Sequence, residues 1–203
     1  VYDIQVPMYE KVGWQHKVDM YSLDGRTIKV APYEVKAYKA VGWYTYEGYL
    51  YAKLKENVNE YISSGKYSNA MSLIDGIEYV FYDTEYEYSV RKLKERAMDL
   101  WRSSIKCPLA YVSSYTGKYS ETPTITLYFR NVSYKDITAF RVEYTCYDVF
   151  GEVIRKTQEY TVRDAGLASG EYDAYTWEVY DSNIDHIGDV KITEVVYSDR
   201  TKW

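Results

Sequence analysis

The sequence has few of the side chains that carry out most enzyme chemistry. It contains two histidines and two cysteines in 203 residues, and they are scattered along the chain. A Ser or Cys hydrolase needs a nucleophile beside a base that a third group orients. Neither His16 nor His186 follows a strand–turn–helix pattern, and no Gly-x-Ser-x-Gly motif is present. Because zinc-ligand spacing is also missing, we expect neither a catalytic nucleophile nor a metal site.

Long apolar runs and a basic face are missing as well. Apolar runs are only a few residues long, so the sequence predicts no membrane-spanning helix. The 25 basic and 30 acidic residues are interspersed and give a net charge of −5. Nucleic-acid binding needs a basic stripe, and nucleotide binding usually a Gly-rich loop. We therefore expect no nucleic-acid partner and no cofactor.

The small number of cysteines leaves the redox compartment undecided. Cys146 falls on the inward side of a predicted strand, and Cys107 directly precedes Pro108. These positions do not suggest close approach, so two buried free thiols are the favoured interpretation and a disulfide the alternative.

Acidic residues are plentiful, but only one group has the spacing of a known site. Asp181, Asn183 and Asp185 match the first three ligand positions of a calcium loop. The loop then fails, since His186 replaces the required Gly and Ile192 replaces the bidentate Glu. A solvated acidic loop between strands is therefore favoured. Other carboxylate pairs are uninformative, because a glycosidase needs two acids at a set distance across a cleft.

Tyrosine is the residue present in excess, at 27 of 203 positions. Its apolar ring and polar hydroxyl suit strands and half-exposed surfaces. A Tyr-rich β surface is the simpler interpretation, and a glycan- or protein-binding face is the more specific one.

The clearest pattern lies between Thr124 and Ile154. Ile125, Leu127 and Phe129 alternate with polar residues, which is typical of a half-buried strand. After a turn over residues 131–136 the alternation resumes, with Phe140, Val142, Tyr144 and Cys146 on the apolar side. A second sheet must cover these faces.

Shorter strands should follow, and the linkers are polar. We predict a loop over 113–123, another over 163–170, and strands at 153–154, 160–162, 175–179 and 190–197. The last strand should belong to a hairpin that is closed around Ser198-Asp199-Arg200. Six or seven strands at this spacing are typical of an immunoglobulin-like antiparallel β-sandwich.

Two motifs in this region resemble a known family. Asn131 to Gly151 reads N-x-S-x-K-x-I-x-A-F-x-V…Y-D-x-F-G, and Ser198 to Trp203 reads S-D-x-T-x-W. They resemble an immunoglobulin-like domain family of unknown function, found in secreted proteins and lipoproteins of Gram-positive gut bacteria. The resemblance implies an extracellular location and a non-catalytic role. Asn131-Val132-Ser133 also matches an N-glycosylation acceptor.

Residues 47–106 have helical periodicity instead. Two apolar stripes flank a break at 63–66, where Gly65 to Ala70 resembles the turn of a tetratricopeptide repeat. A third helix should begin at a capping box of Thr84 and Glu87. Its predicted apolar face is Tyr86, Val90, Leu93, Ala97, Leu100 and Trp101, with Lys92, Lys94 and Arg96 facing away.

The first 46 residues contain a repeat. MYEKVGW, ending at Trp14, recurs as AYKAVGW, ending at Trp43. The second copy alone is complete, with strands at 17–21 and 27–30, a type I′ turn at Asp24-Gly25 and a short helix from Pro32. Met20 to Trp43 resembles short repeats of uncharacterised surface proteins and lipoproteins in the same bacteria.

The sequence thus predicts an α+β chain of three domains. They are a β-β-α repeat module (1–46), a tetratricopeptide-like hairpin with a third helix (47–106) and an immunoglobulin-like sandwich (107–203). The favoured function is a non-catalytic extracellular surface protein that acts as a spacer or protein-interaction module. The alternative is a glycan-binding module that uses exposed Trp14, Trp43 and Tyr44, although both tryptophans also suit a core. An enzyme is the least favoured class.

Overall fold

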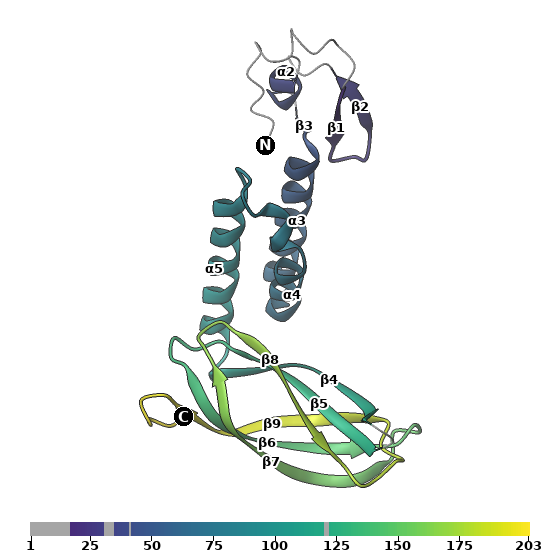
Figure 1. Cartoon of the computed structure of the whole chain (residues 1–203), viewed down its shortest axis with the longest axis vertical. Coiled ribbons are helices and arrows are strands. Elements are labelled where there is room, and N and C mark those ends of the chain that lie inside the picture. Colours follow the sequence, from purple (N-terminus) through teal and green to yellow (C-terminus); the bar gives the residue numbers. More distant parts are fainter. Residues whose placement is uncertain (1–16, 31–34, 41, 120–121) are drawn as a thin grey trace. The chain divides into compact units, whose positions relative to one another are not determined.

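The computed structural model describes residues 17–30, 35–40, 42–119 and 122–203 (Figure 1). The chain divides into two compact units, Val1–Leu100 and Trp101–Trp203. The described residues form several helices and three antiparallel sheets, one of them in the first unit and two in the second. The predicted mixture of helices and antiparallel sheets is therefore confirmed.

The first unit opens with a small sheet and a short helix. In chain order these elements are β1 (Val18–Ser22), β2 (Thr27–Val30), α2 (Val35–Ala40) and β3 (Trp43–Tyr44). The sheet order is β2-β1-β3, and Met20, Val30 and Val35 form its buried core. Strand β3 was not predicted, because two residues are too few to show an alternation. The first copy of the repeat lies outside the described residues.

The hairpin turn depends on Gly25, as predicted, but its type differs. Gly25 has a φ of 90°, whereas Asp24 is not in the left-handed region. The Gly25 amide donates to the Ser22 carbonyl at 3.0 Å, and the Ser22 amide donates to the Arg26 carbonyl at 3.0 Å. These bonds define a three-residue loop that ends in a left-handed glycine, so the predicted type I′ turn is wrong.

We predict that Gly25→Val lowers the free energy of unfolding by about 1–2 kcal/mol, because a β-branched residue is strained at positive φ. A Cβ at this position would meet nothing within 4 Å, so the loss would come from the backbone and not from a clash. Gly25→Asn is the matched control, since Asn tolerates this conformation. Equal denaturation midpoints for both variants would contradict the assigned turn.

The three predicted helices of the first unit are confirmed. They are α3 (Tyr46–Ser63), α4 (Tyr67–Ile77), which continues into the 3-10 helix η2 (Glu78–Phe81), and α5 (Glu87–Ser104). Thr45 caps α3 by accepting a hydrogen bond from the Gly48 amide at 3.4 Å. Each helix buries one stripe. The buried apolar residues are Leu54, Val58, Ala70, Met71, Ile74, Phe81, Val90, Leu93, Ala97, Met98 and Trp101.

Three details of α5 differ from the prediction. Leu100 is exposed, and Lys94 does not face away but lies 2.8 Å from carboxylate oxygens of both Asp75 and Glu78. Thr84 and Glu87 do not form the predicted capping box, because both accept from amides that precede the helix. Thr84 accepts from the Tyr86 amide at 3.2 Å, and Glu87 accepts from the Asp83 amide at 3.1 Å.

The second unit contains two three-stranded antiparallel sheets. Their strands are β4 (Leu109–Tyr119), β5 (Thr122–Asn131), β6 (Ile137–Tyr147), β7 (Val153–Leu167), β8 (Tyr172–Glu178) and β9 (His186–Tyr197). The orders are β4-β5-β8 and β7-β6-β9.

Two strand assignments from the sequence are wrong. Residues 113–119 continue β4, whose polar composition suits an edge strand that pairs only with β5. The two short strands predicted at 153–154 and 160–162 are parts of the single strand β7, which also includes residues 163–167 of a predicted loop. The last predicted hairpin is confirmed. Strand β9 ends at the Ser198-Asp199-Arg200 turn, after which the Thr201 carbonyl accepts from the Tyr197 amide at 3.0 Å and Lys202 bridges to Val196.

The core of the second unit lies where the apolar faces of β5 and β6 meet. The two strands belong to different sheets, and their Phe129 and Phe140 rings pack edge to face with centroids 4.9 Å apart. Every predicted inward residue of both strands is buried. The alternation therefore identified the core correctly, and each strand covers the other.

Trp177 packs against the same core from β8. Its indole Nε1 donates to the Tyr144 hydroxyl at 3.0 Å, and its ring stacks on Tyr160 with centroids 4.0 Å apart. Tyr175, Trp177 and Val179 all pack against the core as partly buried residues, which confirms the predicted orientation of this strand.

We predict that Trp177→Ala lowers the free energy of unfolding by about 3–5 kcal/mol. The substitution removes a ring from the core, leaves a cavity there and removes the stacking contact with Tyr160. Trp177→Phe should lose only about 1 kcal/mol, since it keeps an aromatic ring and removes one hydrogen bond. Chemical denaturation measures both values. A wild-type midpoint for Trp177→Ala would show that the indole is not part of the core.

Candidate functional site

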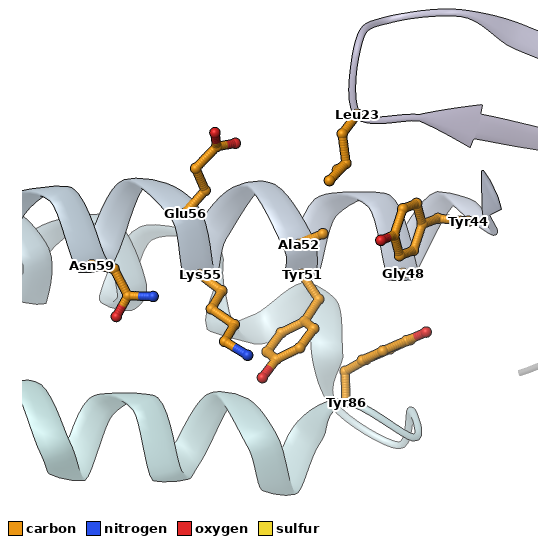
Figure 2. A pocket seen from close by; sticks show the side chains of 9 residues that line it. All are labelled: Leu23, Tyr44, Gly48, Tyr51, Ala52, Lys55, Glu56, Asn59 and Tyr86. Carbon is orange, nitrogen blue, oxygen red and sulfur yellow. The ribbon is translucent and has the colours of Figure 1, made fainter. Parts of the chain in front are cut away.

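The first unit carries an open pocket of about 530 Å³, which we call the tyrosine groove (Figure 2). It lies along the exposed side of the N-terminal half of α3, between the β1–β2 loop and the residue that precedes α5. Its lining combines aromatic and polar side chains. The lining residues are Leu23, Tyr44, Gly48, Tyr51, Ala52, Lys55, Glu56, Asn59 and Tyr86.

Local packing sets the positions of two of the three rings. Tyr51 and Tyr86 stack with centroids 5.1 Å apart, and both contact the buried ring of Phe81 edge to face. Gly48 makes room for this arrangement, because a Cβ there would lie 2.7 Å from the Tyr86 hydroxyl oxygen. The groove therefore has a preformed aromatic wall.

The polar groups of the groove include a basic side chain, an acidic side chain, an amide and tyrosine hydroxyls. Burial, followed by the negative charge of Glu85, raises the pKa of Tyr86 to about 12. Its hydroxyl is therefore a protonated hydrogen-bond donor at neutral pH. Glu56 pairs with Lys53 at 3.1 Å, and Asn59 accepts from Arg96 at 3.2 Å, whereas Lys55 is exposed. Rings, hydroxyls, an amide and an ammonium could together hold a polar ligand with one apolar face.

One of the three predicted site residues lines this groove. Tyr44 contributes its ring (Figure 2). Trp43 lies in β3, where its backbone pairs with Ser22, and Trp14 lies outside the described residues. The sequence did not lead us to Tyr51 and Tyr86. The local density of tyrosine between residues 44 and 51 was the one signal that could have indicated the groove.

The polar side chains of the loop that resembles a calcium site contact other groups of the protein. The Asp181 carboxylate accepts from the Asn183 amide at 3.1 Å and lies 3.7 Å from Arg155. His186 stacks on Tyr147 with centroids 5.1 Å apart and contacts Asp185. Within the described ranges, no three His, Cys, Asp or Glu side chains are grouped so that they could hold a metal ion.

Both cysteines are free, as predicted. Cys107 is half-buried and Cys146 is buried, and burial raises the pKa of each thiol. Their thiolate fraction at neutral pH is therefore low, which makes them poor nucleophiles. Among the helices that the structure describes, none is long and apolar enough to cross a membrane.

Asn131 is not a glycosylation acceptor in the folded chain. It is fully buried, and its Nδ2 donates to the carbonyls of Lys135 at 2.8 Å and Leu167 at 2.9 Å. Its Oδ1 accepts from both the amide and the hydroxyl of Ser133. The side-chain amide is therefore held by hydrogen bonds within the fold, and its burial argues against the weak match of this tripeptide to an acceptor.

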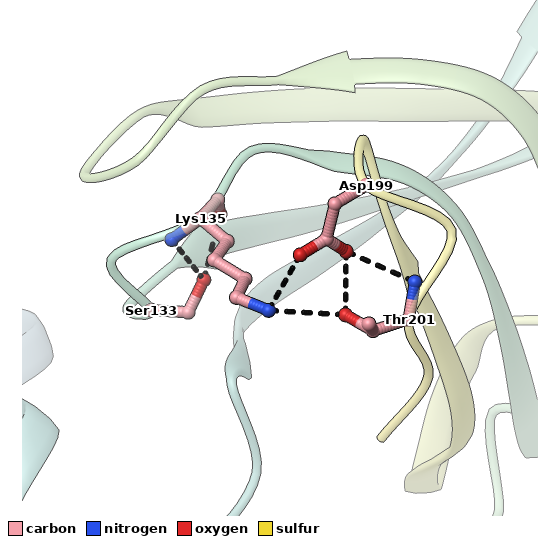
Figure 3. Close-up of polar contacts among 4 residues, drawn as sticks. All are labelled: Ser133, Lys135, Asp199 and Thr201. Atoms are coloured by element: carbon pink, nitrogen blue, oxygen red, sulfur yellow. Dashed lines mark hydrogen bonds and ion pairs between the residues drawn. The ribbon is translucent and has the colours of Figure 1, made fainter.

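Other polar residues of the two motifs, Asn131 to Gly151 and Ser198 to Trp203, also bond to one another (Figure 3). The Lys135 ammonium lies 2.7 Å from Asp199 and donates to the Thr201 hydroxyl at 3.1 Å. Asp199 also accepts from the Thr201 amide at 2.9 Å. These contacts join the β5–β6 turn to the segment that follows β9. We call this set of residues, Asn131, Ser133, Lys135, Asp199 and Thr201, the motif network.

Comparisons with known proteins give only distant structural similarity. No family model and no curated protein matches the chain. A hypothetical protein from Peptoclostridium difficile 630 is 13% identical, with a TM-score of 0.38, over 49% of this chain and 87% of that chain. A DUF1425 family member from Shewanella sp. pv-4 is 11% identical, with a TM-score of 0.31, over 42% of this chain and 76% of that chain.

The motif network should make the second unit sensitive to acid. Its hydrogen bonds with Lys135 and Thr201 hold the pKa of Asp199 far below its usual range. A lowered carboxyl pKa stabilises the fold above the pKa of the unfolded chain, and the stabilisation is lost as pH falls towards the folded-state pKa. We predict that the melting temperature of the wild type falls more steeply below about pH 4 than that of Asp199→Asn. Parallel slopes in thermal melts from pH 5 downwards would contradict this role.

Proposed function

We propose that the chain is a non-catalytic extracellular module, whose second unit is an immunoglobulin-like support for binding surfaces. The strand pairing supports this proposal. The second strand of the unit, β5, pairs with the fifth, β8, and the third, β6, pairs with the sixth, β9. Immunoglobulin-like sandwiches pair strands B with E and C with F in the same way.

The motif network is the observation that carries the proposal. The polar residues that make the sequence resemble a family of secreted proteins and lipoproteins bond to one another and to backbone groups. These hydrogen bonds support a structural role for the motif residues. A spacer or interaction module at the envelope of a Gram-positive gut bacterium is the function that this use of the motif favours.

Glycan binding at the tyrosine groove is the second candidate, and the Tyr51–Tyr86 wall favours it. A sugar ring has an apolar face and a hydroxyl-lined edge. The aromatic wall suits the first, and Tyr86, Lys55 and Asn59 suit the second. The groove is open, which would let an internal segment of a polysaccharide pass through.

A binding screen against cell-wall and host polysaccharides tests both candidates. If the groove binds a glycan, we predict that Tyr44→Ala weakens binding about tenfold, which is the loss of one stacking contact of about 1.4 kcal/mol. Tyr79→Ala is the matched control, because Tyr79 is exposed in η2 of the same unit and does not line the groove. Isothermal titration calorimetry measures the affinities.

The outcomes separate the functional classes. Binding that is equal in both variants would place the ligand elsewhere, and no binding to any polysaccharide would favour the spacer or protein-interaction role. New reducing ends, released on incubation with a bound polysaccharide, would contradict the non-catalytic proposal.

A further inference from the structure

One end of the second unit exposes an unusual amount of apolar surface. Phe150 is 86% exposed, Tyr180 is 87% exposed and Val149 is 71% exposed. With Val153 these residues form what we call the apolar tip. Val149 and Phe150 belong to the β6–β7 turn, Val153 begins β7, and Tyr180 belongs to the segment between β8 and β9. The turn and this segment lie at the same end of the unit (Figure 1). Large exposed apolar groups at one end of a fold are typical of interaction sites.

The turn that carries Phe150 is held in one conformation. Asp148 Oδ1 accepts from the amides of Phe150 at 2.9 Å and Glu152 at 2.8 Å, and the Asp148 amide donates to the Glu152 carbonyl at 3.0 Å. Gly151 closes the turn at a φ of 79°. A preformed turn that presents an aromatic side chain binds with a smaller loss of conformational entropy than a flexible loop.

The segment between β8 and β9 lies beside this turn, and residues of both line a pocket. The Asp185 amide donates to the Tyr147 carbonyl at 2.8 Å, which ties the segment to the end of β6. The pocket is open and has a volume of about 510 Å³. Its lining is half apolar and half polar, and two of the polar residues are acids. The lining residues are Val149, Phe150, Ile154, Ile184, Asp148, Ser182, Asn183 and Asp185.

The charge around the tip is mainly negative, although Lys118 of β4 pairs with Pro123, whose carbonyl accepts from the Val179 amide. Segments 147–154 and 179–189 contain neither Lys nor Arg. Their acids are Asp148, Glu152, Asp181, Asp185 and Asp189. Arg155 of β7 lies beside Asp181 and offsets part of this charge. Because the remaining acids border the apolar residues, the surface would repel an anionic lipid layer and attract a cationic partner.

We propose that the apolar tip is a docking site for a basic, apolar-rich segment of another protein. Phe150 and Tyr180 are the aromatic anchors, and the pocket between the two loops receives an apolar side chain or the aliphatic stem of an Arg or Lys. The acids at the rim pair with the basic groups of that segment. This arrangement, with aromatic anchors inside a charged rim, is the usual anatomy of a protein interface. The proposal does not depend on the tyrosine groove.

Two short synthetic peptides test the proposal with the whole chain. One alternates Arg and Lys with Leu and Trp, and the other carries Glu at every basic position. Fluorescence anisotropy should show binding of the basic peptide only, with an affinity that falls as salt is added. The double variant Phe150→Ser with Tyr180→Ser should weaken binding at least about tenfold. Glu152→Lys should weaken it several-fold.

Tyr134→Ser is the matched control, because Tyr134 is 76% exposed in the turn at the other end of β6. It should leave peptide binding unchanged, and the double variant should keep the wild-type melting temperature. Failure of the basic peptide to bind, equal binding of both peptides, or unchanged binding by the double variant would overturn the proposal. Binding to phosphatidylglycerol vesicles that the double variant abolishes would assign the tip to a lipid surface instead.

Discussion

The second unit depends on the burial of one amide side chain. Asn131 ends β5, and it must satisfy every polar atom within the protein because no solvent reaches it. It does so by bonding to the β5–β6 turn and to the last residue of β7, so two segments that are distant in sequence must meet there. Its own backbone also bonds to Gly170 and Glu171 before β8. An unsatisfied amide in this position would destabilise the fold, and this makes the arrangement specific.

Other polar groups gather around this amide at the same end of the unit. Arg102 donates to the carbonyls of Val132 and Ser133, and Lys135 reaches the segment after β9. The apolar tip lies across the length of β6 from this network. Exposed aromatic residues occur at both ends of the unit, with Tyr134 beside the network and Phe150 at the tip. In the first unit, the tyrosine groove provides a second, chemically different surface.

Much of the local structure could be predicted from the sequence, because it depends on neighbours within a few positions. Helical periodicity located α3, α4 and α5, and alternation identified the buried faces of β5 and β6. Gly25 was recognised as the turn residue because few other side chains adopt a positive φ without strain. Tyr44 was named as a site residue, but its partners in the groove come from α3 and from the residue before α5.

The sequence by itself determined which segments form helices, which faces are apolar and where the main turns fall, since these properties repeat at short range. Only the tertiary structure decided which sheet each strand joins, because pairing brings together residues that are far apart in the chain. It also decided that the polar 113–119 segment is the edge of a sheet, that Lys94 is an ion-pair partner and that Asn131 is buried. In each case the polar group found its partner across the fold, and no local pattern records such a partner.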